Sequence, residues 1–143
     1  MGQGRSSQAT PAHSFTEHTS EVRVRLTAPT FGGLLGEAGR ALAELLADEE
    51  PGPLQAPERV SLQGADRVAL LVHWLNELVF LSETRKQIYA WFDVQVATDR
   101  EVVAQVRGWA ASRVRTQVKA ATFHGLAVAE GPEGLQAEVV LDV

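Results

Sequence analysis

The stretch LQAEVVLDV, residues 135–143, alternates apolar and polar side chains in the way of a half-buried β-strand. The preceding turn GPEG, residues 131–134, is expected to fold this strand back onto an earlier one as a hairpin. The strand ends on Asp142 and Val143, so a side-chain carboxylate stands next to the α-carboxylate of the last residue. Either a hard cation binds these two anions or they form a plain solvated chain end.

Upstream of the hairpin, the apolar pattern alternates between strand and helix periods. The expected helices cover residues 31–46 and 67–84, with Thr30 and Asp66 as N-caps. The other expected strands are residues 22–27, 59–64, 88–97, 101–109 and 118–130. This order predicts an α+β fold, a two-layer sandwich of two helices and about six mainly antiparallel strands.

Length and composition limit the possible function classes. The 143 residues fit one domain, and we expect a flexible tail over residues 1–14 followed by a domain over residues 15–143. The net charge of -5 argues against broad clamping of a nucleic-acid backbone, which needs a basic face. Cysteine is absent, which excludes disulfides and thiol chemistry and agrees with a cytosolic protein. Residues 1–14 contain no apolar run, so neither a signal peptide nor a membrane span is expected there.

Two polar clusters have side chains that suit a cation or a proton transfer. The sequence EHTSE, residues 17–21, places His18 between two glutamates just before a strand, although a solvated loop is the plainer interpretation. His73 and Glu77 lie four residues apart on one helix face, a spacing that a metal site can use. An ordinary polar helix face explains that pair equally simply.

A third cluster is KAATFHG, residues 119–125, where Lys119 is one of only two lysines in the chain. A lysine at a strand start can hold a phosphate or a partner's carboxylate as a point charge, or it can simply protect an edge strand from aggregation. The sequence has no Gly-rich phosphate loop, no hydrolase triad order and no HExxH motif. These absences weaken every enzyme interpretation.

Four motifs together resemble the archease family, in the same order and at similar spacing. They are residues 17–21, residues 70–78 (LLVHWLNEL), residues 119–126 (KAATFHGL) and residues 139–143 (VVLDV). The resemblance runs from about Ser14 to Val143 and implies a small cytoplasmic α+β protein that is not itself an enzyme. It implies a cofactor of the RtcB-type RNA ligase, which acts in tRNA splicing and RNA repair. The protein would promote guanylylation and multiple turnover of the ligase, touch RNA only through the ligase, and involve no membrane.

The resemblance also implies a divalent-metal site, expected to hold calcium, with magnesium and manganese as alternatives. Glu21, Asp142 and Val143 match the family's metal ligands. Lys119 matches the family's functionally important lysine, and His124 lies in the same motif. We therefore expect Lys119 and His124 to carry the cofactor activity.

The chain departs from the family pattern at three positions around this site. Glu21 stands where the family usually has Asp, Arg23 stands where glycine is common, and His73 replaces a usual Asp. We expect His18, His73 and Glu77 to surround the metal ligands rather than to bind the metal directly. The longer side chain at Glu21 and the added charge at Arg23 predict weaker metal binding, or a different ion.

Two other function classes stay open from the sequence. One is a metal-dependent hydrolase or phosphoesterase that acts alone, with His18 and His124 as acid and base. The other is a general chaperone-like interaction module. Intrinsic phosphoesterase activity would favour the first, and protection of unrelated proteins from aggregation would favour the second.

Overall fold

The computed structural model describes residues 10–17, 20–122 and 127–143, which form two helices and eight strands. In chain order these are β1 (Ala12–Glu17), β2 (Glu21–Ala28), α1 (Phe31–Leu46), β3 (Glu58–Gln63), α2 (Arg67–Arg85), β4 (Gln87–Ala97), β5 (Glu101–Ala110), β6 (Ala120–Thr122), β7 (Val128–Gly131) and β8 (Gly134–Asp142). The predicted α+β class is confirmed, with eight strands where about six were expected.

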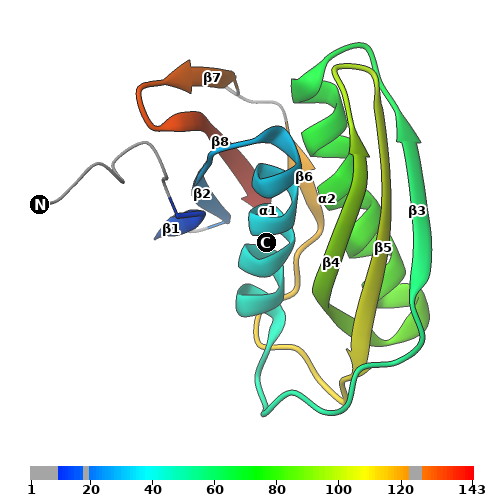
Figure 1. The fold of residues 1–143 in the computed structure, drawn as a ribbon. Coiled ribbons are helices and arrows are strands. Elements are labelled where there is room, and N and C mark those ends of the chain that lie inside the picture. The colour runs from blue at the N-terminus through cyan, green and yellow to red at the C-terminus, as the bar shows by residue number, and fades with distance from the viewer. Residues whose placement is uncertain (1–9, 18–19, 123–126) are drawn as a thin grey trace, which may run out of the picture.

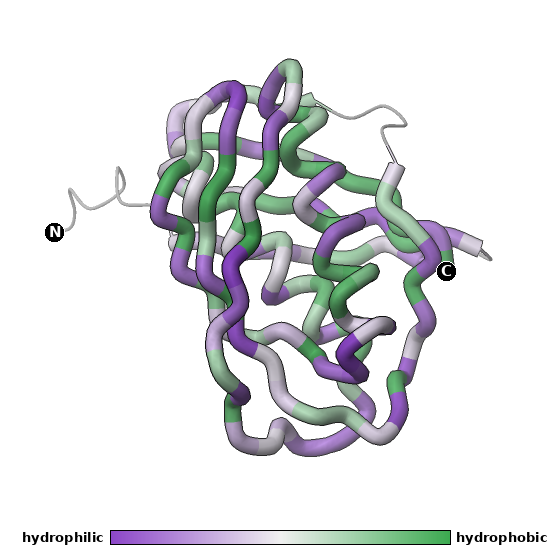
Figure 2. The backbone as a smooth tube through the Cα atoms, turned by 90° about the vertical axis from the view of Figure 1, so that its right-hand side faces the viewer, coloured by the Kyte–Doolittle hydropathy of each residue, from purple (hydrophilic) through white to green (hydrophobic). Residues whose placement is uncertain are grey.

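The strands form two antiparallel sheets. The first sheet has the order β1-β2-β8-β6, with β7 also paired to β8, and the second has the order β3-β5-β4. Helix α1 lies between the two sheets and packs on β2 on one side and on β4 on the other (Figure 1). Apolar and polar residues alternate along the strands, as Figure 2 shows, so each sheet turns one face to the helices. A sheet on both sides of α1 is a packing that the two-layer prediction did not include.

Helix α1 forms because its surroundings bury it, although its sequence contains four glycines. Thr30 is the N-cap, as predicted, and its hydroxyl accepts a hydrogen bond from the N–H of Gly33 at 3.0 Å. Only Arg40 and Glu44 are exposed along the helix. A Cβ at Gly39 would lie 2.5 Å from the ring of Phe92 on β4, so glycine lets the helix and the sheet approach this closely.

Helix α2 begins after its predicted N-cap, and its buried face contacts α1 through a hydrogen bond. The carboxylate of Asp66 accepts a hydrogen bond from the N–H of Ala69 at 2.8 Å. Trp74 is fully buried, and its indole N–H donates to the carbonyl of Leu35 on α1 at 2.8 Å. Neither helix of the described chain combines the length and the apolar character needed to cross a lipid bilayer.

Two segments differ from the sequence prediction. Strand β1 begins at Ala12, inside the expected tail of residues 1–14, because His13 and Phe15 turn inward toward α1 and the core. The single strand expected over residues 118–130 is two short strands, β6 and β7, which pair with different parts of β8. The register of β7 on β8 is shifted relative to that of β6, so one continuous ladder cannot contain both.

Candidate metal and partner site

Glu21 and Asp142 are direct partners at one end of the first sheet. Glu21 is the first residue of β2 and Asp142 is the last residue of β8, and the antiparallel register sets them opposite each other. Directly opposed residues point to the same face, with Cβ atoms about 4.5–5.5 Å apart. The two carboxylates, far apart in the sequence, therefore lie side by side. On the other edge of β8 lies β6 (Figure 1), and the register there pairs Ala120 with Asp142.

Main-chain hydrogen bonds fix two further residues beside this carboxylate pair. The N–H of Val143 donates to the carbonyl of Ser20 at 3.1 Å, and the N–H of Lys119 donates to the carbonyl of Asp142 at 2.8 Å. The side chain of Lys119 is exposed, whereas Asp142 and Val143 are half-buried. The fold thus brings Glu21, Asp142, Val143 and Lys119 to one sheet end. Their role as metal ligands and as a functional lysine stays a prediction.

Among the residues that the structure describes, the carboxylate pair is only partly neutralised. Like charges directly opposite each other destabilise a sheet unless another charge offsets them. Arg23 on β2 approaches Glu21 with 3.9 Å between Nη2 and Oε1, and its Nη1 lies 3.4 Å from Oε1 of Glu138. Within residues 10–17, 20–122 and 127–143, the carboxylate of Asp142 has neither an ion pair nor a side-chain hydrogen bond. A cation at this position would therefore meet an uncompensated carboxylate.

The donor set at this sheet end suits a hard cation. Carboxylate and main-chain oxygens are the ligands that calcium and magnesium prefer. In the part of the chain that the structure describes, no group of three or more His, Asp or Glu side chains is placed to hold a metal. A cation here would thus depend on the Glu21 and Asp142 side chains together with the carboxylate or main-chain oxygens at Val143.

The remaining predicted site residues are not drawn into this cluster. His18 and His124 lie outside the described residues. On α2, His73 is exposed and Glu77 is half-buried. Between described residues, neither of these two makes a hydrogen bond or ion pair with Glu21 or Asp142. Their expected place around the metal ligands stays a prediction.

Asn76 is a positioning residue whose role the sequence did not indicate. Its side-chain oxygen accepts a hydrogen bond from the N–H of Ala121 at 2.8 Å, and its side-chain nitrogen donates to the carbonyl of the same residue at 3.2 Å. The amide thus bonds the edge of β6 as a neighbouring strand would. The available signal was a polar residue directly after Leu75, at the border between the buried and the exposed face of α2. Because β8 holds the other edge of β6, this strand, which directly follows Lys119, is fixed from both sides.

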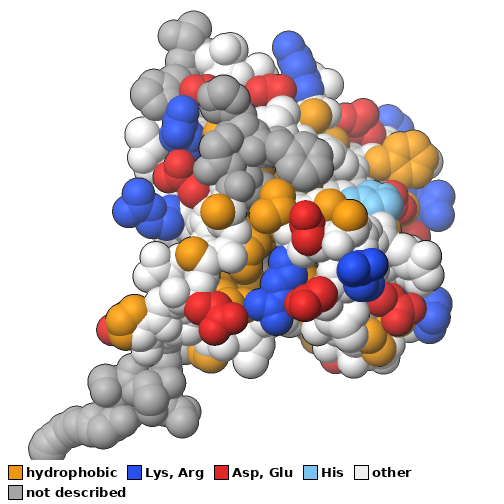
Figure 3. All heavy atoms as spheres, turned by 90° about the horizontal axis from the view of Figure 1, so that it is seen from above, with side chains coloured by type: hydrophobic (Ala, Val, Ile, Leu, Met, Phe, Trp, Pro, Cys, Tyr) orange, Lys and Arg blue, Asp and Glu red, His pale blue; other side chains and the backbone are white. Residues whose placement is uncertain are grey.

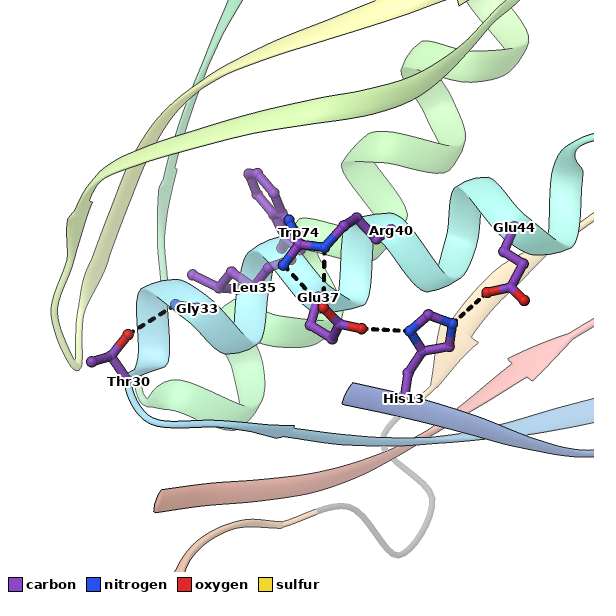
Figure 4. Close-up of polar contacts among 8 residues, drawn as sticks. All are labelled: His13, Thr30, Gly33, Leu35, Glu37, Arg40, Glu44 and Trp74. Carbon is purple, nitrogen blue, oxygen red and sulfur yellow. Dashed lines mark hydrogen bonds and ion pairs between the residues drawn. The ribbon is translucent and has the colours of Figure 1, made fainter. Parts of the chain in front are cut away.

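A second polar cluster joins β1 to α1, away from the carboxylate pair. Nδ1 of His13 lies 2.6 Å from Oε2 of Glu37, its Nε2 contacts Glu44, and Arg40 donates to Glu37 at 3.0 Å (Figure 4). Glu37 is only 6% exposed. Partial burial of the ring lowers the pKa of His13, but the hydrogen bonds to Glu37 and Glu44 and their charges raise it, with a net value above 6.5. This cluster fastens the edge strand to the helix.

On the face that Figure 3 shows, basic and acidic side chains are interspersed rather than gathered by sign. Three arginine and glutamate pairs, two between β2 and β8 and one within β2, show the same mixing, with Arg25 lying 3.6 Å from Glu138. Such a face does not provide the continuous positive field that binds a nucleic-acid backbone.

Known proteins match the chain over nearly its whole length. The archease protein family matches residues 13–143. Protein archease of Methanopyrus kandleri is 31% identical over 135 residues, which are 89% of this chain and 96% of that relative. Protein archease of Methanosarcina mazei is 24% identical over 139 residues, which are 92% of this chain and 95% of that relative. The family match covers the whole range that the motifs indicated, from about Ser14 to Val143.

Two solved structures share the fold. The solution structure of protein 1598 of Methanobacterium thermoautotrophicum superposes with a TM-score of 0.75 at 24% identity, and covers 92% of this chain and 98% of its own. The crystal structure of a Thermotoga maritima archease, described as a possible chaperone, has a TM-score of 0.62 at 18% identity, and covers 90% of this chain and 94% of its own. At these identities the two structures establish the arrangement of helices and strands.

Proposed function

Because the chain belongs to the archease family, we propose that it is a cytoplasmic protein cofactor of an RtcB-type RNA ligase and does not itself join RNA. It promotes guanylylation of the ligase and its multiple turnover, in tRNA splicing and RNA repair. The observation that carries this proposal is the pairing of Glu21 with Asp142 beside Lys119, at the positions that the family resemblance assigns to function.

The proposal includes a divalent cation held by Glu21, Asp142 and the carboxylate of Val143. Calcium is the first candidate, with magnesium and manganese as alternatives. Two opposed carboxylates support it, because they repel each other in the absence of a counter-charge and are good ligands for hard cations. When bound, the ion would supply the positive charge that offsets this repulsion. The protein's own part is to hold the ends of β2 and β8 in register.

Lys119 is the group that we assign to contact with the partner. Its side chain is exposed, while its main chain is tied to Asp142 and the following strand is fixed by Asn76. A lysine placed in this way presents a point charge to a carboxylate or a phosphate of the ligase active centre. The net charge of -5 supports contact with RNA through the ligase rather than directly.

The decisive experiment mixes the purified protein with an RtcB-type ligase, GTP and a divalent metal, and follows ligase guanylylation and the number of RNA joining events per ligase. The expected result is faster guanylylation and multiple turnover. Unchanged guanylylation and turnover would refute the proposed function.

A matched pair of lysine variants tests the role of Lys119. Lys119→Asn is expected to lower activation about tenfold or more, which corresponds to the loss of one charged contact of about 1.4 kcal/mol. Lys86→Asn is the control, because Lys86 is exposed and adopts a left-handed conformation (φ 55°) that asparagine tolerates. The control should stay within about twofold of the unmodified protein, since an exposed side chain that has no partner among the described residues contributes little. Equal losses in both variants would point to net charge and not to a contact at Lys119.

The metal site has its own test. Asp142→Asn removes one carboxylate and should weaken calcium binding measured by calorimetry on the protein alone, with a parallel loss of ligase activation. A few residues added after Val143 should also weaken calcium binding and lower ligase activation, because they remove the carboxylate there. Full activation by that extended variant would exclude the carboxylate of Val143 from the mechanism.

A further inference from the structure

Arg23 stands at the centre of a charge ladder across β2 and β8. Its guanidinium reaches toward Glu21, at 3.9 Å, and toward Glu138, at 3.4 Å. Glu21 faces Asp142, and Arg25 faces Glu138, so all of these side chains lie on the same face of the sheet. Arg23 is therefore the one cation, among the described residues, that forms an ion pair with a member of the proposed metal site.

The position of Arg23 lets it compete with a metal ion for the carboxylate of Glu21. A carboxylate that approaches a divalent cation must give up part of its interaction with a neighbouring guanidinium, because two positive charges beside one carboxylate repel each other. The distance of 3.9 Å is longer than a hydrogen bond, so Glu21 is held weakly and can be released. Glu138 lies closer to Arg23 and offers it a second carboxylate once Glu21 is engaged elsewhere.

We propose that Arg23 is an internal counter-ion that sets the affinity of the Glu21 and Asp142 site for divalent metal. In the metal-free protein it partly neutralises Glu21, and on metal binding it pairs with Glu138 alone. This inference rests on the proposed function, since it concerns the same site. Its consequence is a site that binds metal more weakly than two opposed carboxylates would do without an arginine nearby.

The test measures binding of calcium chloride to the isolated protein by titration calorimetry, at low ionic strength so that exposed charges are little screened. Arg23→Gln is expected to tighten calcium binding about fivefold, which corresponds to about 1 kcal/mol. Arg25→Gln is the matched control. It removes the same charge from the same strand and the same face, but Arg25 pairs with Glu138 and not with Glu21. It should change calcium affinity less than about twofold, as expected for a distant exposed charge.

A double variant that conserves charge separates competition between Arg23 and the metal for Glu21 from an effect of net charge. Arg23→Gln combined with Glu138→Gln leaves the net charge of the protein unchanged, and still removes the guanidinium beside Glu21. It should bind calcium more tightly than the unmodified protein. Circular dichroism on each variant confirms that the fold is kept.

The outcomes distinguish this inference from the function on which it rests. Equal affinity in the unmodified protein, Arg23→Gln and the double variant would overturn the role of Arg23 and leave the metal site in place. Tighter binding of the same size in Arg23→Gln and Arg25→Gln would also overturn it, because net charge would then be the cause. No calcium binding by any of the proteins would overturn the metal site itself, and the role of Arg23 with it.

Discussion

Replacing Asn76 with alanine removes the two hydrogen bonds that hold the outer edge of β6. The side-chain amide of Asn76 bonds both the N–H and the carbonyl of Ala121, at 2.8 and 3.2 Å. Each such bond contributes about 1 kcal/mol net to stability. Ala121 is only 5% exposed, so its peptide groups would also lose a partner in a place that water reaches poorly, at a further cost of about 1 kcal/mol or more.

We therefore expect Asn76→Ala to lower the free energy of unfolding by about 3 kcal/mol. For a chain of this length the midpoint of thermal unfolding should fall by about 10 °C. Urea denaturation at equilibrium measures the first quantity, and hydrogen exchange at the Ala121 amide shows directly whether the edge of β6 has opened.

Thr84→Ala is a control on the same helix, because Thr84 is exposed. Its effect should stay within about 0.5 kcal/mol. A loss below about 1 kcal/mol in Asn76→Ala, with the Ala121 amide still protected, would refute the reasoning. In that case β8 alone would hold β6.

Three further changes test other contacts. The pKa of His13 is raised in the folded protein, so the stabilisation from its protonated ring is fully present below pH 6.5 and is lost as the pH rises through the folded-state pKa. The difference in unfolding free energy between the unmodified protein and His13→Gln should therefore shrink from pH 6 to pH 9. A constant difference in urea titrations would contradict this. Gly39→Ala should destabilise by about 1–3 kcal/mol because its Cβ would meet the ring of Phe92, whereas Gly36→Ala, whose Cβ would make only ordinary contacts, should be neutral or stabilising in the same thermal melts. Trp74→Phe deletes the indole hydrogen bond to α1 and part of a fully buried ring, and should cost about 2 kcal/mol by chemical denaturation, while a change below about 0.5 kcal/mol would show that the helix pair does not depend on it.

The sequence was sufficient to predict features that depend on contacts between residues close together in the chain. The caps at Thr30 and Asp66 were predictable, because a capping side chain bonds the main chain three residues later. Strand β1 was missed since its support comes from distant partners, the ladder with β2 and the contact of His13 with Glu37 on α1, and a short polar segment carries no mark of such partners.

The candidate site depends even more on contacts between distant segments, which the sequence pattern does not reveal. Alternation predicts that Glu21 lies just before one strand and that Asp142 lies near the end of another, but not that the two strands are neighbours in this register. Only the resemblance to a known family connected them. The two hydrogen bonds of Asn76 to Ala121 join an α-helix to a strand 45 positions away, and no periodicity encodes such a contact.

The pairing of β2 with β8 has a consequence for how the protein folds. These strands come from the two ends of the described domain. Both helices and all of the other described strands except β1 lie between them in the sequence. Closing so long a loop is entropically costly, and topologies rich in distant pairings fold on a millisecond-to-second timescale. The central ladder of the first sheet is therefore expected to form late, after the compact unit of α1, α2 and the second sheet. The carboxylates of Glu21 and Asp142 meet only in chains that have completed this step, so the capacity to bind metal would itself report that folding is finished.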